Sequence, residues 1–72
     1  MAVNYNGLWK MLIDKGMKRS DLITEAKISG NILAKLGKNE YVSMETLEKL
    51  CICLNCDIGQ IVSLKIPEEK RE

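Results

Sequence analysis

Apolar residues in this chain recur at intervals of three and four, in short runs that end at glycine, at asparagine or before a capping residue. This spacing places the apolar side chains of each run on one face of a helix. The first run consists of Tyr5, Leu8, Trp9, Leu12 and Ile13. Gly16 follows it and readily takes the left-handed conformation of a helix stop. The pattern favours short amphipathic helices packed against one another.

Capping residues mark the ends of the following helices. Ser29 is a good N-cap for a third helix that Gly37 ends, and Ser43 caps a fourth helix that Asn55 ends. The apolar stripes of the second, third and fourth helices are Leu22, Ile23 and Ala26; Ile32, Leu33 and Leu36; and Leu47, Leu50, Cys51 and Leu54. Each predicted helix has roughly two to three turns.

The C-terminal part of the chain begins with a fifth predicted helix. Asp57 and Gln60 have the spacing of a capping box, and the run that follows is Ile58, Ile61 and Val62. Beyond it, only residues 63–66 alternate in the manner of a strand. Leu64 and Ile66 in this segment either fold back on the domain, fray, or pair across a two-fold axis as an edge strand.

A chain of 72 residues, 46% of them apolar, is long enough for one small domain with a thin core. We therefore expect an all-α fold, a compact five-helix bundle over residues 5–62. Residues 63–72 form a C-terminal extension that we expect to be partly flexible, because it ends in Pro67 and the charged run 68–72.

Several function classes are disfavoured by composition. The chain has no histidine, the residue that most often serves as general base and as metal ligand. A core this thin also leaves little room for a substrate pocket. We expect no enzyme, no cofactor and no small-molecule substrate. No apolar run approaches the ~20 residues that span a bilayer, and no signal-peptide pattern is present, so we expect a cytoplasmic protein with no membrane partner.

The three cysteines, Cys51, Cys53 and Cys56, invite comparison with a metal site. On a helix Cys51 and Cys53 point about 200° apart, so they cannot hold one ion together. Cys53 and Cys56 share a face but supply only two ligands. An odd number of cysteines also disfavours a secreted disulfide scaffold. We expect core or surface thiols and no metal, with redox sensing as the alternative.

The connection between the second and third helices is the most informative segment for function. Residues 26–29 leave about three residues between two amphipathic helices, the length of a helix-turn-helix connection. Residues 1–39 carry seven basic and three acidic groups (+4), whereas residues 40–72 carry four basic and seven acidic groups (−3). A positive half that contains the third helix suits phosphate binding. The same features also fit a generic helical interaction module, since every soluble helix has a charged exposed face.

The third helix carries the candidate base-reading residues. Asn31, at its second position, has an amide that matches an adenine edge, and Lys35 lies four residues later on the same face. Lys38 and Asn39 follow at the end of the helix. Candidate phosphate contacts are Lys18, Arg19 and Ser29.

These residues carry a resemblance to a known family. The sequence resembles the Cro/phage-repressor (XRE-type) helix-turn-helix proteins, and looks closest to their small stand-alone bacterial members. Residues 8–17 are similar to the family's first helix, and residues 28–31 and 34–40 to its recognition helix and the loop that follows. Its last two helices are similar to residues 42–43, 46–47, 49–51 and 54–59. The resemblance covers roughly residues 5–62.

The resemblance implies a five-helix, lambda-repressor-like domain that places its third helix in the major groove of double-stranded DNA, usually as a homodimer on a near-palindromic operator. It implies a regulator of transcription, commonly a repressor. Base readout would fall on Gly30, Asn31, Lys35 and Lys38. Phosphate contacts would fall on Lys18, Arg19, Ser29 and Asn39. The alternative is a helical protein-interaction or antitoxin-like module with little specific DNA affinity.

Four positions depart from the family pattern. Lys27 occupies a turn position that is often glycine, where a left-handed backbone costs a non-glycine residue about 1 kcal/mol, so we expect a differently shaped turn. Ile23 replaces an alanine that allows close packing, so we expect the two helices to lie slightly further apart. Lys18 stands where a capping hydroxyl is common. Gly30 has no side chain for base contact, so specificity would rest on few contacts, those of Asn31 and Lys35, and on DNA shape.

Overall fold

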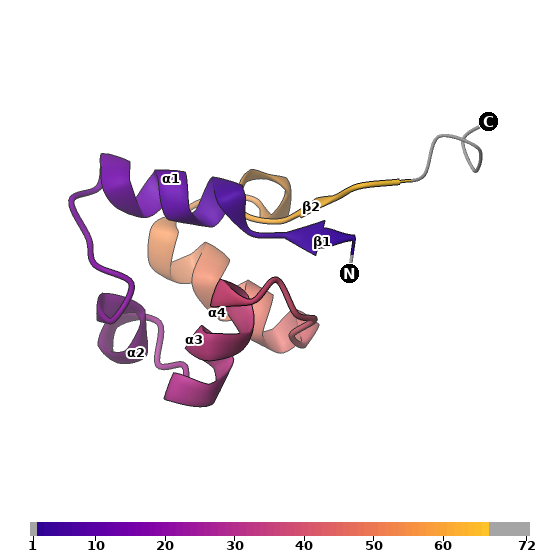
Figure 1. Cartoon of the computed structure of the whole chain (residues 1–72). Helices are drawn as coiled ribbons and strands as arrows, with labels where there is room; N and C mark the ends of the chain where they lie inside the picture. The colour runs from indigo at the N-terminus through magenta and orange to yellow at the C-terminus, as the bar shows by residue number, and fades with distance from the viewer. Residues whose placement is uncertain (1, 67–72) are drawn as a thin grey trace.

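The computed structural model describes residues 2–66, which form four α-helices, one 3-10 helix and a two-stranded sheet. The elements in chain order are β1 (Val3–Asn4), α1 (Asn6–Asp14), α2 (Asp21–Glu25), α3 (Gly30–Gly37), α4 (Met44–Leu54), the 3-10 helix η1 (Ile58–Gln60) and β2 (Ser63–Leu64). The fold is mainly helical, as expected, but the predicted count of five helices is wrong (Figure 1). None of the helices in the described part is both long and apolar enough to cross a membrane.

The predicted fifth helix is the single 3-10 turn η1. Its cap is the predicted one, since the Asp57 N–H donates to Gln60 Oε1 at 2.8 Å. Ile61 directly follows η1 with 0% exposure, and Ser63 two residues later already pairs with β1. Because Ile61 turns into the core and the chain then extends into β2, no residues remain to continue a helix.

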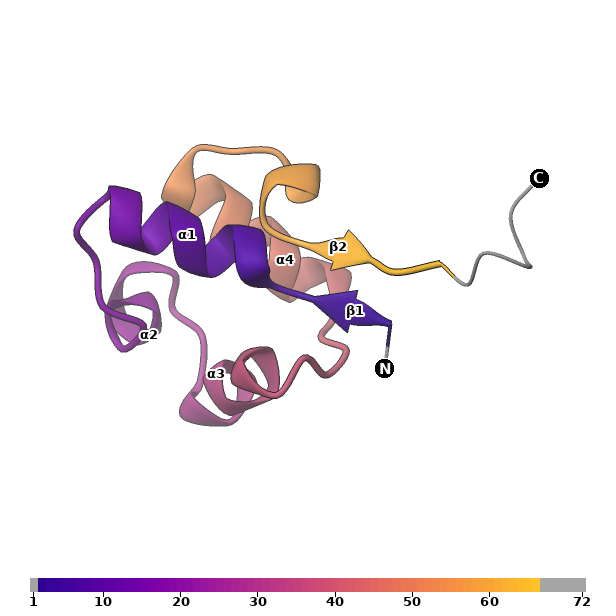
Figure 2. The same ribbon diagram turned by 45° about the horizontal axis from the view of Figure 1, so that its top comes forward.

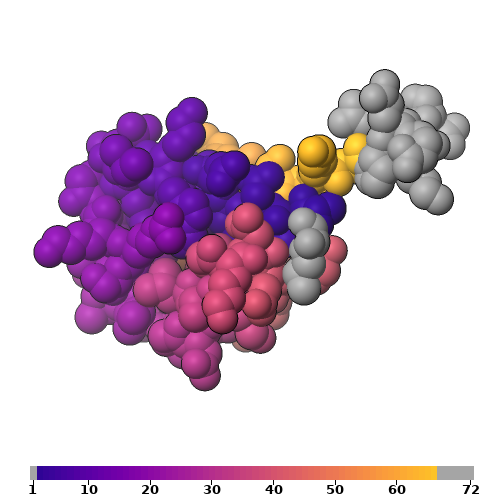
Figure 3. Space-filling model, viewed as in Figure 1, coloured from indigo at the N-terminus to yellow at the C-terminus, as the bar shows by residue number. Residues whose placement is uncertain are grey.

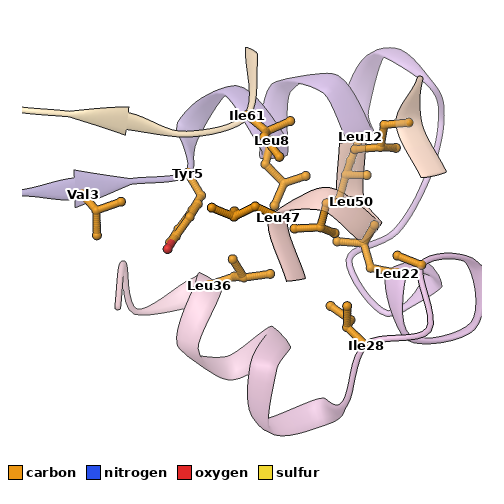
Figure 4. Close-up of a cluster of buried hydrophobic side chains, with 12 residues drawn as sticks. Val3, Tyr5, Leu8, Leu12, Leu22, Ile28, Leu36, Leu47, Leu50 and Ile61 are labelled. Carbon is orange, nitrogen blue, oxygen red and sulfur yellow. The ribbon is translucent and has the colours of Figure 1, made fainter. Parts of the chain in front are cut away.

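One hydrophobic core lies between the helices. In both ribbon views α2 and α3 cover the lower side of the molecule, opposite η1 and β2 (Figures 1 and 2). The buried apolar residues are Val3, Tyr5, Leu8, Leu12, Leu22, Ala26, Ile28, Leu36, Leu47, Leu50, Leu54 and Ile61. Leu22 of α2, Leu36 of α3 and Leu50 of α4 point into the same interior (Figure 4). This core holds α3 by its apolar side and leaves its other side exposed.

The inward face of α1 is narrower than predicted. Tyr5, Leu8 and Leu12 are buried and Trp9 is half-buried, but Ile13 is 76% exposed. Successive residues of a helix are turned by about 100°, so a position next to Leu12 faces away when α1 contacts the core through one narrow stripe. Ile13, predicted to share one face with the other four residues, therefore does not belong to the buried face of α1.

The helix stop at Gly16 is confirmed. Gly16 has φ 68°, and its N–H donates to the Ile13 carbonyl at 3.1 Å. The Met17 N–H donates to the Leu12 carbonyl at 2.8 Å. These two bonds form a Schellman motif, which satisfies carbonyls that the end of α1 would otherwise leave unpaired.

α3 ends at Gly37, as predicted, but the left-handed residue that closes its end lies two residues further along the chain. Gly37 is the last helical residue, and the left-handed residue is Asn39, with φ 57°. The Glu40 N–H closes the motif on the Lys35 carbonyl at 2.9 Å. Asparagine tolerates this conformation better than most residues, so Asn39 rather than Gly37 supplies the left-handed residue after α3.

The segment after η1 folds back on the domain and pairs within the same chain. Val3 lies opposite Leu64 and Asn4 opposite Ser63 in an antiparallel pair, and the Lys65 N–H donates to the Ala2 carbonyl at 2.8 Å. The side chains of Leu64 and Ile66 nevertheless stay exposed. This pair is a departure from a purely helical fold. The expected flexible tail, residues 67–72, lies outside the described residues.

Candidate nucleic-acid interface

α2 and α3 are joined by a tight turn with one left-handed residue, Lys27, at φ 58°. Ala26 and Ile28 on either side of it are both buried, at 5% and 6% exposure. The chain must reverse between two residues that both point into the core, and burial of both outweighs a backbone cost of about 1 kcal/mol at Lys27. The expectation of a differently shaped turn was therefore wrong.

The packing between α2 and α3 also differs from the prediction. Ile23 is 40% exposed, so it does not stand between the two helices as a spacer. Leu22 and Ala26, four residues apart on the inner face of α2, are buried instead. The small Ala26 side chain occupies the position next to the turn, where α2 and α3 approach each other.

The entry into α2 is held by a carboxylate. The Lys18 N–H donates to Asp21 Oδ2 at 2.9 Å, which is the reverse half of a capping box. Asp21 thus stabilises this turn although Lys18 has no capping hydroxyl. The side chains of Lys18 and Arg19 are exposed directly before α2.

The N-terminus of α3 is capped as predicted. Ser29 Oγ accepts the Ile32 N–H at 3.1 Å. Gly30 and Asn31, the first two helical residues, are exposed, and nothing lies within 4 Å of a Cβ built on Gly30. Backbone N–H groups in the first turn of a helix lack intrahelical partners, so this end of α3 presents donors and a positive dipole end outward.

The exposed face of α3 gathers the predicted base-reading residues. Gly30, Asn31, Lys35 and Lys38 are all exposed, whereas Ile32 and Leu33 are half-buried and Leu36 is buried. The two sets lie on opposite sides of the helix, as a repeat of about 3.6 residues requires. Asn39, predicted to contact phosphate, is exposed at the end of the helix.

Ala34 belongs to the same face and was missed in the sequence. It is exposed and lies three residues after Asn31, in line with Lys38 four residues later. An alanine methyl suits apolar contact with a thymine methyl in the major groove. The sequence signal for Ala34 was that it lies outside the apolar stripe of the third helix. This signal is weak, because alanine is small and apolar and is found on both buried and exposed faces.

The segment from the turn before α3 to the end of α3 carries positive charge only. Residues 26–39 contain three lysines, Lys27, Lys35 and Lys38, and no acidic residue. The surfaces of α2 and α3 adjoin on the lower side of the molecule (Figure 3). These lysines are three of the seven basic groups of residues 1–39, and the exposed N-terminus of α3 adds its positive dipole end.

Arg19 has a defined place beside this face. Its Cζ atom lies 3.8 Å from the centroid of the Trp9 ring in α1. A Cβ built on Gly37, the last residue of α3, lies 3.7 Å from Arg19 Nη1. The predicted phosphate residue is therefore held between the first helix and the end of the third.

The cysteines lie outside this region, in and after α4. Burial raises the pKa of Cys51 and of Cys53, and the neighbouring Cys56 and an acidic side chain near each act in the same direction. A raised pKa keeps both groups as thiols at neutral pH. Within residues 2–66 no group of three or more His, Cys, Asp or Glu residues is arranged to hold a metal ion.

Comparison with known proteins gives two matches. A family model described as a Cro/C1-type HTH DNA-binding domain matches residues 7–67. The chain is also similar to the crystal structure of the transcriptional regulator VanUg (form II), with a TM-score of 0.85 and 48% sequence identity, over 93% of this chain and 88% of that chain. No curated protein sequence matches this chain.

Proposed function

Because the chain belongs to the family of Cro/C1-type helix-turn-helix DNA-binding domains, we propose that it is a sequence-specific regulator of transcription that reads double-stranded DNA with α3. The observation that carries this proposal is the exposed face of α3, which joins an uncovered helix N-terminus to an amide and two lysines without an acidic side chain. The similar VanUg structure is that of a transcriptional regulator, which supports the proposal.

The residues of α3 would read base edges in the major groove. Asn31 would pair with an adenine through its amide, and Lys35 and Lys38 would donate to guanine acceptors. Gly30 would let the backbone come close to the bases, since nothing occupies the space beside it. Ala34 would add apolar contact between the polar groups.

The residues at the edges of α3 would hold the DNA backbone. Lys18 and Arg19 before α2, Ser29 at the cap and Asn39 at the C-terminal stop are all exposed. Ser29 accepts the Ile32 N–H through its oxygen and retains its hydroxyl hydrogen for a phosphate oxygen. These contacts fix the register of α3 but carry no sequence information.

We further propose that the protein acts as a homodimer on a near-palindromic operator and represses transcription by occupying it. Two recognition helices related by a two-fold axis match half-sites spaced about one helical turn, ~34 Å, apart. One domain of this size offers few base contacts, so two copies are needed for useful specificity.

Selection from a random duplex library at near-physiological salt tests the proposal. We expect enrichment of an inverted repeat with half-sites about one turn, ~10 base pairs, apart. A single unrepeated motif would retain sequence-specific reading and refute the dimer. A pool with no enriched sequence, and retention that disappears as salt rises, would refute sequence-specific regulation.

Asn31→Ala tests the assignment of base readout within the selected site. We expect a loss of about 1–3 kcal/mol of discrimination at one base pair per half-site. Asn6→Ala is the matched control, since Asn6 is an exposed asparagine at the N-terminus of α1. Equal binding of all base variants by Asn31→Ala and by the wild type would contradict this register of α3.

A further inference from the structure

The contact between Trp9 and Arg19 joins two elements that the sequence leaves unrelated. Trp9 lies in α1, half-buried, and packs against the hydrophobic core. Arg19 lies in the turn before α2, with Cζ 3.8 Å from the indole centroid. This distance is that of a planar guanidinium stacked on an aromatic face. The core therefore fixes the ring, and the ring fixes the guanidinium.

Stacking leaves the N–H donors of Arg19 available. A guanidinium uses its flat face in such a contact, and its N–H groups point outward in the plane. Within residues 2–66 these donors have no hydrogen-bond acceptor. Arg19 is thus an exposed cation with a restricted conformation and an unfilled hydrogen-bonding edge, which suits a bidentate contact with a phosphate.

The hydrogen-bonding edge of Arg19 lies next to the C-terminal end of α3. A Cβ on Gly37 would be in ordinary van der Waals contact with Arg19 Nη1, at 3.7 Å. A larger side chain at this position would compete with the guanidinium for space. Arg19 Nη1 therefore lies directly beside the C-terminal end of α3, within reach of any side chain longer than alanine at position 37.

We propose that Trp9 is a positioning residue for DNA binding, which holds Arg19 ready for a backbone phosphate beside the C-terminal end of α3. This inference rests on the proposed function and adds to it a residue that does not touch DNA. A free arginine loses rotamer freedom when it binds a phosphate. An arginine already stacked on Trp9 has lost most of that freedom in the folded protein, so phosphate binding is stronger.

A double-mutant cycle with Trp9→Leu and Arg19→Gln tests the inference on a duplex of fixed sequence. We expect Arg19→Gln to weaken binding on the order of tenfold and to reduce the salt slope by about one unit. Trp9→Leu should weaken binding about two- to fivefold in the wild-type background and not at all in the Arg19→Gln background. Trp9→Phe, which keeps a ring with a weaker cation–π contact, should fall between wild type and Trp9→Leu.

Two controls separate positioning from folding and from general charge. Thermal midpoints of all variants are measured first, and binding is compared well below the lowest of them. Lys65→Gln removes one positive charge from an exposed residue that directly follows β2. Since β2 lies on the side opposite α2 and α3 (Figures 1 and 2), this change should leave the salt slope unchanged. Trp9 is the only tryptophan, so Arg19→Gln should change the fluorescence of the free protein.

The outcomes distinguish this inference from the proposed function. An equal effect of Trp9→Leu in both backgrounds would mean that Trp9 acts only through the fold and would overturn the inference. An unchanged salt slope in Arg19→Gln would overturn it as well. Wild-type protein without salt-dependent affinity for duplex DNA would overturn the proposed function, and this inference with it, whatever the fluorescence shows.

Discussion

At the scale of single residues, a buried tyrosine joins the start of α1 to the segment that follows α3. Tyr5 precedes α1 with 1% exposure, and its hydroxyl donates to the Glu40 carbonyl at 2.6 Å, just after the stop of α3. Burial raises the pKa of the Tyr5 phenol, and the nearby Tyr41 adds to the shift, while a hydrogen bond with the Val42 backbone opposes it. The neutral phenol is therefore the form that the fold favours.

Tyr5→Phe should cost more stability at neutral pH than at alkaline pH. At pH 7 we expect a loss of about 0.5–1.5 kcal/mol in the free energy of unfolding, because the hydrogen bond is lost. The raised pKa means that the contribution of Tyr5 is complete below the ordinary value of about 10 and declines as pH rises through the folded-state pKa. The deficit of Tyr5→Phe should therefore shrink above pH ~10.

Denaturant unfolding between pH 7 and 11 measures this effect. Tyr41→Phe is the matched control, since it removes a phenol that is 61% exposed. A deficit of Tyr5→Phe that stays constant over the whole pH range would contradict the assignment of the buried neutral phenol.

Gly7 is required because α1 passes against η1 with no room for a side chain. A Cβ on Gly7 would collide with the backbone carbonyl oxygen of Gln60. Alanine would normally favour a helix by up to about 1 kcal/mol over glycine, but backbone against backbone cannot relax by a rotamer change. We expect Gly7→Ala to destabilise the protein by about 1–3 kcal/mol, measured by denaturant unfolding.

Gly59→Ala is the control for this substitution, because nothing lies within 4 Å of a Cβ at that position. Gly59 lies within η1 itself, so the two variants test the same contact region with and without the collision. Equal stability of Gly7→Ala and Gly59→Ala would contradict the close approach of α1 and η1.

At the scale of secondary-structure elements, two serine caps perform the same local task in different places. Ser29 accepts the Ile32 N–H at the start of α3, and Ser43 accepts the Thr46 N–H at the start of α4, both at 3.1 Å. Ser43 also donates to Thr46 Oγ1, which satisfies the buried Thr46 side chain. Only the cap of α3 lies at the proposed DNA surface.

Ser29→Ala and Ser43→Ala should therefore separate stability from binding. Each should lower the free energy of unfolding by about 0.5–2 kcal/mol. Measured below both thermal midpoints, Ser29→Ala should also weaken duplex binding, whereas Ser43→Ala should not. Equal binding by the two variants would contradict the assignment of Ser29 as a phosphate contact.

At the scale of the whole molecule, the antiparallel pairing of β1 with β2 joins the segment before α1 to the segment after η1. Val3 of β1 is buried at 4% exposure, whereas β2 contributes mainly backbone hydrogen bonds, since Ser63 and Leu64 are exposed. A two-stranded pair is only marginally stable by itself. Its contribution is to hold Val3 and Tyr5 in place over the core.

Truncation after Val62 should lower the thermal midpoint and leave α3 intact. The loss of one or two net hydrogen bonds, about 1–2 kcal/mol, corresponds to roughly 4–16 °C for a domain of this size. Affinity for a single half-site, measured below that midpoint, should stay within about twofold. Truncation after Ile66 is the control. A large loss of half-site affinity in the shorter chain alone would mean that β2 supports the DNA-binding surface directly.

The sequence by itself determined the features that depend on neighbouring residues. The caps Ser29 and Ser43, the stop at Gly16 and the Asp57–Gln60 box are confirmed, because each joins atoms that lie at most five residues apart in the chain. The same holds for the length of the connection between α2 and α3, though not for its shape, and for the division of α3 into an apolar and an exposed side. The family resemblance carried by these segments is likewise confirmed.

Only the tertiary structure decided the features that join distant parts of the chain. The pairing of Val3 with Leu64, the bond from Tyr5 to Glu40 and the stack of Arg19 on Trp9 have no local signal. Packing also placed Ile13 and Ile23 outside, and it kept Lys27 left-handed between two buried neighbours. Local hydrogen bonds fix where a helix begins and ends, but burial of the common core selects which of its faces turns inward, and that choice depends on every other element.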